Sequence, residues 1–273
     1  MSPEVYLVPT DFTIIGDSAI AHAVKSGQKA GAHICLLHVV EDKKDIQKAE
    51  DTLEKMAEKA MNESSLTINY VVSVGNIFDD IGSVAEELGA SIIFMGTHGL
   101  KGWQFLTGSR ALKVITNSTV PFIVVQDKFP KRSYQNIVMP IDLSIEDKQK
   151  LTSVVEVAKM FDSKVHIVAP MQTDEFLANR LNRNMNFAKT YMNENDVDHD
   201  THIADGSIEF DEAVIKYAQE MNADLITIIN HEDAATALFG NSFEQSVITN
   251  VAKIPVMVVN QKIITRIGSV IGT

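Results

Sequence analysis

Short apolar runs alternate along this chain with longer stretches in which apolar side chains recur at helical spacing. In the first half, Ile81, Val84, Ala85 and Leu88 follow the i, i+3, i+4, i+7 pattern of one helical face. A charge-rich helical stretch is expected over Asp42–Met61. The runs rich in β-branched and aromatic residues, which we expect to be strands, are Val5–Pro9, His33–Val40, Leu66–Val74, Ser91–Met95 and Pro121–Val125.

The same succession is written twice. Tyr6–Thr13 (YLVPTDFT) aligns with Ile137–Ser144 (IVMPIDLS) at an offset of 131, and Val114–Asn117 (VITN) recurs as Val247–Asn250 at an offset of 133. A repeat of this length is a whole domain and not a solenoid unit. The boundary falls near the polar stretch Asp127–Ser133. We therefore expect domains at residues 1–129 and 134–260, followed by an apolar extension, 261–273, that packs on a neighbouring surface.

Strands that alternate with longer helices form βαβ units, which give a parallel sheet with helices on both faces. The pattern thus predicts two tandem, open, parallel-sheet α/β domains. In such sheets ligands bind beyond the carboxyl ends of the strands, where the strand order reverses. The segments to inspect are Pro9–Asp11 after the first strand, His38–Val39 after the second, and the loop after the fourth.

Composition narrows the function classes. The net charge of −12 over 273 residues argues against nucleic acid as a main partner, because binding to phosphate backbones needs clustered Lys and Arg. No apolar stretch approaches the roughly 20 residues that span a bilayer, and the first residues lack the pattern of a secretory signal. The single cysteine, Cys35, lies in an apolar run and is expected to be a buried, inert thiol. A cytoplasmic protein is expected.

Residues 96–109 (GTHGLKGWQFLTGS) hold four of the chain's 14 glycines and link an expected strand to an expected helix. The spacing fits neither the Walker A pattern nor the Gly-x-Gly-x-x-Gly dinucleotide pattern. Glycines allow the backbone to approach an anion closely, and Gly108-Ser109 at a helix start would offer free N–H groups and a hydroxyl. The loop is therefore either a phosphate cradle or a turn that closes the sheet.

Three segments together resemble the universal stress protein family: Pro9-Thr-Asp11, Leu36-Leu-His-Val39, and Met95-Gly-Thr-His-Gly99 followed by Gly108-Ser109. The duplication makes the chain similar to a tandem member. The resemblance implies a five-stranded, doubly wound sheet of the adenine nucleotide alpha hydrolase-like type, and dimers. Some members bind ATP through Gly-x2-Gly-x9-Gly-[Ser/Thr]. Here eight residues, not nine, separate Gly99 from Gly108.

Carried over by matching residues, the resemblance implies that Asp11 lies near the ribose and adenine, that the Val39 backbone reads the adenine edge, and that the glycines and Ser109 hold the phosphates. The nucleotide-binding residues expected on this basis are Pro9, Thr10, Asp11, Val39, Gly96, Thr97, His98, Gly99, Gly108 and Ser109. The ligand implied is ATP or another adenine nucleotide, accompanied by Mg²⁺.

The role expected is a stress-response or signalling one without significant turnover, in a homodimer whose two domains pair within each chain, with no nucleic acid or membrane partner. Two alternatives stay open. One is a nucleotide-free interaction module, and the other is a slow ATP hydrolase. Asp11 also has a structural alternative, as a turn or N-cap residue of the following helix.

The second copy has lost the expected ligand groups. Gly96 corresponds to Ile229, Gly99 to Glu232 and Gly108 to Asn241, while Val39 corresponds to Pro170, which has no N–H. We predict that this domain does not bind nucleotide. Because the copy is specified without these glycines, we interpret the glycines of the first copy as ligand-binding and not as a requirement of the sheet.

One further cluster, Asp196–His202, contains the His199 and His202 pair. A polar loop before a strand at Thr201–Ala204 is favoured over a zinc site, because residues three apart split across the faces of a strand.

Overall fold

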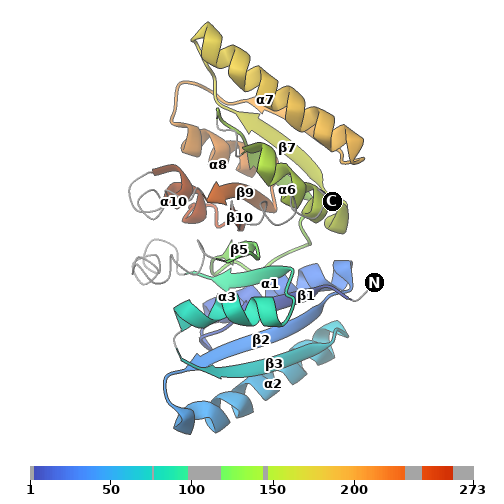
Figure 1. Ribbon diagram of the computed structural model, residues 1–273, viewed down its shortest axis with the longest axis vertical. Coiled ribbons are helices and arrows are strands. Elements are labelled where there is room, and N and C mark those ends of the chain that lie inside the picture. The colour runs from blue at the N-terminus through green and yellow to red at the C-terminus, as the bar shows by residue number, and fades with distance from the viewer. Residues whose placement is uncertain (1–2, 76, 98–117, 144–146, 231–241, 261–273) are drawn as a thin grey trace, which may run out of the picture. The chain divides into compact units, whose positions relative to one another are not determined.

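The computed structural model describes residues 3–75, 77–97, 118–143, 147–230 and 242–260. The chain divides into two compact units, Met1–Ser133 and Tyr134–Thr273. Each unit is described by itself below, with the element labels of Figure 1.

Unit 1 alternates strands and helices around one parallel sheet. Its elements are β1 (Val5–Pro9), α1 (Ile14–Ala30), β2 (His33–Val40), a 3-10 turn (Lys43–Asp45), α2 (Ile46–Ser64), β3 (Ile68–Val74), α3 (Ile77–Glu87), β4 (Ile92–Gly96) and β5 (Phe122–Val125). The strands lie in the order β3-β2-β1-β4-β5, and every neighbouring pair is parallel.

Unit 2 repeats this plan. Its elements are β6 (Asn136–Pro140), α6 (Asp147–Phe161), β7 (Lys164–Ala169), α7 (Glu175–Glu194), β8 (His199–Ile203), α8 (Phe210–Glu220), β9 (Leu225–Asn230), α10 (Ser242–Ile248) and β10 (Val256–Asn260). The order β8-β7-β6-β9-β10 is again all parallel. Pro9 pairs with Leu37 as Pro140 pairs with Val168, so the offset of 131 holds residue by residue at this edge of the sheet.

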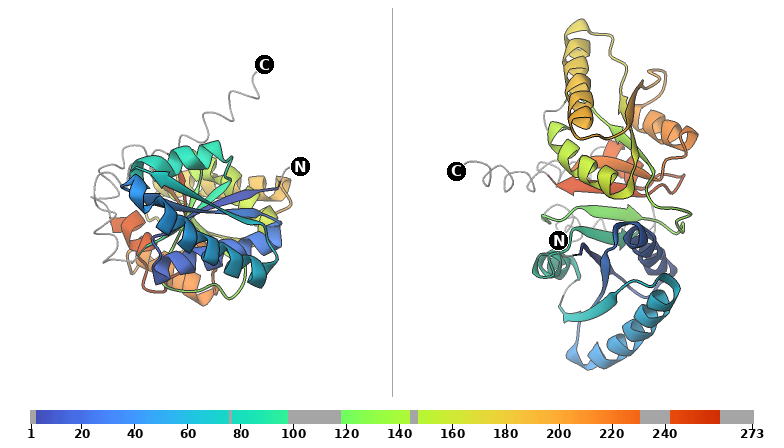
Figure 2. Two further views of the ribbon diagram at one scale, coloured as in Figure 1. Left: turned by 90° about the horizontal axis from the view of Figure 1, so that it is seen from below. Right: turned by 90° about the vertical axis from the view of Figure 1, so that its right-hand side faces the viewer.

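Helices cover both faces of each sheet, as right-handed crossovers require when the strand order runs one way and then reverses. In unit 1, α1 and α2 lie on one face and α3 on the other; in unit 2, α6 and α7 share a face and α8 covers the opposite one (Figure 2). The prediction of two tandem, five-stranded, doubly wound α/β domains is confirmed.

The cores consist of strand residues buried between the helix layers. Leu7, Val8 and Leu36 are fully buried in unit 1, as are Val138 and Ile167 in unit 2. Such strands read as continuous apolar runs because helices cover both of their faces. None of the helices described here is long and apolar enough to cross a bilayer.

Helix α1 is tied to the segment that follows β5. Ser18 Oγ donates to the carbonyls of Gln126 (2.7 Å) and Lys128 (3.2 Å), and His22 Nε2 donates to the Lys128 carbonyl at 2.9 Å. His22 is only 5% exposed, and burial lowers its pKa to about 4 although the hydrogen bond to Lys128 acts in the opposite direction. The neutral imidazole is thus part of the packing of unit 1.

Several expected strand boundaries are wrong. Strand β3 begins at Ile68, two residues after the expected start, and β4 runs one residue later than expected, over Ile92–Gly96. Strand β8 begins at His199, two residues before the expected strand, so His199 and Asp200 belong to the strand and not to a preceding loop. The reason is pairing across the sheet: Asp200 lies opposite His166 of β7, whose Nδ1 is 2.8 Å from the Asp200 carboxylate. Among the described residues, no group of three or more His, Cys, Asp and Glu could hold a metal ion.

Candidate functional site

The carboxyl ends of β1, β2 and β4 converge at one edge of the unit 1 sheet. Strand β1 pairs with β2 on one side and with β4 on the other, so the strand order reverses between β1 and β4. This is the place where open α/β sheets bind ligands. The fold thereby brings Thr10 and Asp11 close to Val39 and Gly96, which are far apart in the sequence.

A tight turn follows β1. The Asp11 Oδ1 accepts hydrogen bonds from Thr13 N (3.1 Å) and Thr13 Oγ1 (2.6 Å). Thr13 in turn is the N-cap of α1, and its hydroxyl accepts from Gly16 N at 3.5 Å. The aspartate therefore has the turn role that was its structural alternative, while the N-cap is Thr13. The Asp11 side chain is exposed at the same time.

Phe12 and His38 form an aromatic pair above this turn. Their rings stack with centroids 4.0 Å apart at an angle of 24°. The His38 Nδ1 donates to the Thr10 carbonyl at 2.8 Å, and Phe12 N donates to Thr10 Oγ1 at 3.2 Å. These contacts join the ends of β1 and β2.

Val39, near the carboxyl end of β2, pairs with Ser73 of β3 in the register of the sheet, and it lies beyond the last β1–β2 pair of Pro9 and Leu37. Alternate residues of a strand point their N–H and C=O groups to opposite neighbours. The Leu37 carbonyl accepts from Thr10 N at 2.9 Å, so the groups of Val39 also face the β1 side. The β1–β2 ladder ends at Pro9 and Leu37, and the Thr10 carbonyl is bonded to His38. A donor and an acceptor are therefore directed past the end of the ladder, where a ligand can reach them.

A pocket of about 400 Å³ lies between this edge and α2. Its residues come from the turn after β1, the end of β2 and the start of α2: Phe12, His38, Val39, Val40, Glu41, Asp45, Lys48, Ala49 and Thr52. Of the predicted site residues that the structure describes, only Val39 lines it. Phe12 was missed, and His38 lay in a segment marked for inspection but was not among the predicted binding residues, although both differ from their counterparts in the second copy.

Gly96 ends β4 against the start of α1. A Cβ at this position would lie 2.6 Å from Ile15 Cγ2 and 2.8 Å from the Ile15 carbonyl oxygen, closer than real side chains approach. The interpretation that the sheet does not demand its glycines is therefore wrong for Gly96. In this unit the close approach of α1 requires glycine whatever the loop binds.

Thr97 follows directly. It is 2% exposed, and its N–H donates to the Val125 carbonyl at 2.8 Å. Its Oγ1 is buried without a hydrogen-bond partner in the described part of the chain. A buried hydroxyl without a partner is costly and points to a group that the hydroxyl could bind.

The four remaining predicted residues, His98, Gly99, Gly108 and Ser109, lie outside the described residues. In unit 2 the equivalent edge keeps the aspartate, as the exposed Asp142, but lacks the threonine hydroxyl. Ile141 stands where unit 1 has Thr10, and its N–H makes the same bond, to the Val168 carbonyl at 2.8 Å. Pro170 replaces Val39, so the donor is absent.

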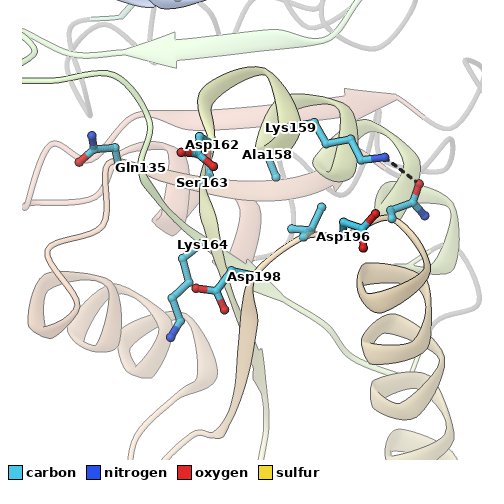
Figure 3. Close-up of a pocket in the computed structure, with 10 residues that line it drawn as sticks. Gln135, Ala158, Lys159, Asp162, Ser163, Lys164, Asp196 and Asp198 are labelled. Atoms are coloured by element: carbon cyan, nitrogen blue, oxygen red, sulfur yellow. Dashed lines mark hydrogen bonds between the residues drawn. The ribbon is translucent and has the colours of Figure 1, made fainter.

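A larger cavity, of about 640 Å³, lies at the opposite, amino-terminal end of the unit 2 strands (Figure 3). The carboxylates of Asp162, Asp196 and Asp198 line it, together with residues at the carboxyl ends of α6 and α7. Its two lysines are engaged: Lys159 Nζ donates to Asn195 at 3.2 Å, and Lys164 Nζ is 3.1 Å from Asp200. Carboxylates and helix carboxyl ends repel anions, so this cavity does not suit a nucleotide phosphate.

Comparison with known proteins gives one consistent answer. The sequence model of the universal stress protein family matches residues 6–126 and again residues 133–260. Universal stress protein MJ0577 of Methanocaldococcus jannaschii is 26% identical over 152 residues, which are 45% of this chain and 94% of that protein. Universal stress protein G of Shigella flexneri is 30% identical over 128 residues, 41% of this chain and 89% of that protein.

Among solved structures, a universal stress protein from Archaeoglobus fulgidus matches with a TM-score of 0.77 and 19% identity. The match covers 96% of this chain and 100% of that chain. At this identity the likeness speaks for the fold, and it extends over both units.

Proposed function

The chain belongs to the universal stress protein family, and from this premise we propose that unit 1 binds ATP or another adenine nucleotide. In this proposal the protein acts in stress response or signalling in the cytoplasm, and it does not hydrolyse the bound nucleotide to a significant extent. Unit 2 binds no nucleotide and serves as a structural partner.

The observation that carries the proposal is the N–H and C=O of Val39, which lie beyond the end of the β1–β2 ladder on the wall of a pocket. A donor and an acceptor on one strand residue match the edge of adenine, which presents an acceptor ring nitrogen beside an exocyclic amino donor. Backbone groups beyond the end of a ladder, at a pocket wall, favour a ligand that supplies their hydrogen bonds. Pro170 cannot do this in unit 2.

The phosphate end is proposed to lie at the end of β4. The buried Thr97 hydroxyl, which has no partner among the described residues, fits a phosphate oxygen or a group bound beside it. Glycine N–H groups and Ser109 would supply the other donors. Since Mg²⁺ keeps several waters and is held largely by nucleotide phosphates, it fits here as a companion of ATP.

The test is a matched pair of substitutions. Gly108→Asp places a carboxylate in the expected phosphate cradle, and Asn241→Asp places the same group at the aligned position of unit 2. We expect millimolar ATP to raise the melting temperature of the wild-type protein and of Asn241→Asp, but not of Gly108→Asp. Absence of an ATP-induced shift in the wild-type protein would refute the proposal, and an unchanged shift in Gly108→Asp would remove the loop from the site.

Assembly remains a prediction. A homodimer, with the two domains paired within each chain, is the arrangement implied by the family resemblance. Native mass spectrometry of the intact chain, with and without ATP, measures the oligomer and any nucleotide that co-purifies.

A further inference from the structure

Phe12 has a backbone conformation that its residue type disfavours. Its φ is 62°, in the left-handed region, where non-glycine residues are uncommon and bulky ones are strained. The side chain is 37% exposed and lines the pocket of unit 1. Strain of this kind persists only where surrounding contacts hold it in place.

Two contacts hold Phe12. Its N–H donates to the buried Thr10 hydroxyl at 3.2 Å, and its ring stacks on His38 at 4.0 Å. His38 is fixed in turn by the Thr10 carbonyl, 2.8 Å from Nδ1. Because a carbonyl oxygen only accepts, Nδ1 carries the proton. We call Thr10, Phe12 and His38 the aromatic clamp.

The fold does not need the aromatic clamp. In unit 2, at identical strand register, Ile141 replaces Thr10, Leu143 replaces Phe12 and Ala169 replaces His38. Ile141 keeps the backbone bond to β7, and Ile141 and Ala169 are buried. The described residue Leu143 has no positive φ. All three members are lost together in the copy that has also lost the Val39 N–H.

We propose that Phe12 is a specificity-determining residue that packs against the planar base of the bound nucleotide, and that His38 is the positioning residue that holds its ring in place. The inference rests on the function proposed above and names the residues that select the base. An aromatic ring beside the backbone groups of Val39 contacts the face of a base whose edge those groups read.

The charges of the residues that line this pocket favour the base, and not the phosphates, as its occupant. Among the described residues that line it, Glu41 and Asp45 carry carboxyl groups and Lys48 carries the one ammonium group. A triphosphate next to two carboxylates would be repelled, whereas a neutral base is not. The phosphates would extend instead towards Thr97 and the end of β4.

The experiment replaces each clamp residue by its unit 2 counterpart in the full chain and measures ATP binding by calorimetry. Phe12→Leu is expected to weaken ATP binding about tenfold, the size typical of one lost base–aromatic contact. His38→Ala is expected to cause a similar loss. The double variant is expected to lose no more than Phe12→Leu, because His38 acts through Phe12.

A second readout separates base contact from a general structural effect. In saturation-transfer NMR, Phe12→Leu should reduce transfer to the adenine ring protons relative to the ribose protons, while a merely structural loss lowers both alike. Phe12→Tyr keeps the ring and should bind ATP as the wild-type protein does. His202→Ala, which removes an imidazole stacked on Tyr217 at 4.2 Å in unit 2, is the matched control and should change nothing.

The possible results distinguish failure of the proposed function from failure of the roles proposed for Phe12 and His38. If the wild-type protein binds no ATP, the proposed function fails and this inference fails with it. If the wild-type protein binds ATP and Phe12→Leu binds it equally well, or loses base and ribose signals equally, only the role of Phe12 is overturned. Additive losses in the double variant would overturn the positioning role of His38.

Discussion

His22 makes the stability of unit 1 depend on pH in a defined direction. The side chain is 5% exposed in α1 and donates to the Lys128 carbonyl at 2.9 Å. Burial lowers its pKa from 6.5 to about 4. The substitution that tests this is His22→Gln, because glutamine is neutral at every pH and its amide reaches a similar position to the imidazole Nε2.

The sign follows from proton binding. Between pH 6.5 and about 4 the unfolded chain binds a proton at His22 that the folded chain excludes, so stability falls as the pH falls through this window. The contribution of neutral His22 is complete above the unfolded pKa and is lost as the pH falls through the folded one. From about pH 7.5 to about pH 5 the loss is about 2 kcal/mol, and it reaches about 3 kcal/mol below both values.

Urea unfolding at the two pH values, followed by circular dichroism, measures this loss. Ser18→Ala is the control: it removes hydrogen bonds from the same helix to the same segment without a titrating group, so it should cost about 1 kcal/mol at both pH values. The transition that Ser18→Ala shifts also identifies the unfolding of unit 1. The reasoning is refuted if His22→Gln keeps the full pH dependence of the wild-type protein.

Three further predictions concern single sites. Gly96→Ala should destabilise unit 1 by about 2 kcal/mol because α1 leaves no room for a Cβ. Gly82→Ala is the control, since a Cβ at Gly82 would have no atom within 4 Å, and it should be neutral or stabilising. Chemical denaturation measures the free energy of unfolding of both variants. Burial raises the pKa of the Cys35 thiol to about 11, so native protein should react with a thiol reagent at neutral pH far more slowly than urea-unfolded protein, and equal rates would contradict the buried placement. Burial opposes ionisation of Asp200, but hydrogen bonds from His166 and Lys164 outweigh burial and hold the pKa of the Asp200 carboxyl group below its usual value. Asp200→Asn should therefore lower the melting temperature near neutral pH. The difference from the wild-type protein should shrink as acid protonates the carboxyl group.

The strand pattern was most reliable where both faces of a strand are covered. β1 and β2 have the bounds that their apolar runs predict, because a strand buried on both sides must be apolar throughout. β8 was misplaced because it lies at the edge of the unit 2 sheet and carries polar residues, which pair with β7 instead of marking a loop. Local composition could not reveal that pairing.

The candidate site was also predictable only in part. The turn after β1 and the end of β2 were predicted as site positions from the fold rule and the family resemblance, and the structure brings Thr10, Asp11 and Val39 to one edge of the sheet. Phe12 was missed, and no binding role was assigned to His38, because neither residue stands out when it is considered alone. The signal was in the sequence, as paired losses at Leu143 and Ala169, but only their contact in space showed that the two changes belong together.

The sequence by itself determined the duplication, the α/β class and the edge of the sheet at which a ligand would bind, because these follow from periodicity and from the rules of parallel strands. Tertiary structure decided which backbone groups lie within a ladder and which glycine is required. It placed the backbone of Val39 beyond the end of the β1 ladder, and it brought the helix that makes Gly96 obligatory against β4. Whether a hydrogen-bonding group is satisfied, or a glycine required, depends on neighbours distant in sequence, and a linear pattern does not carry those distances.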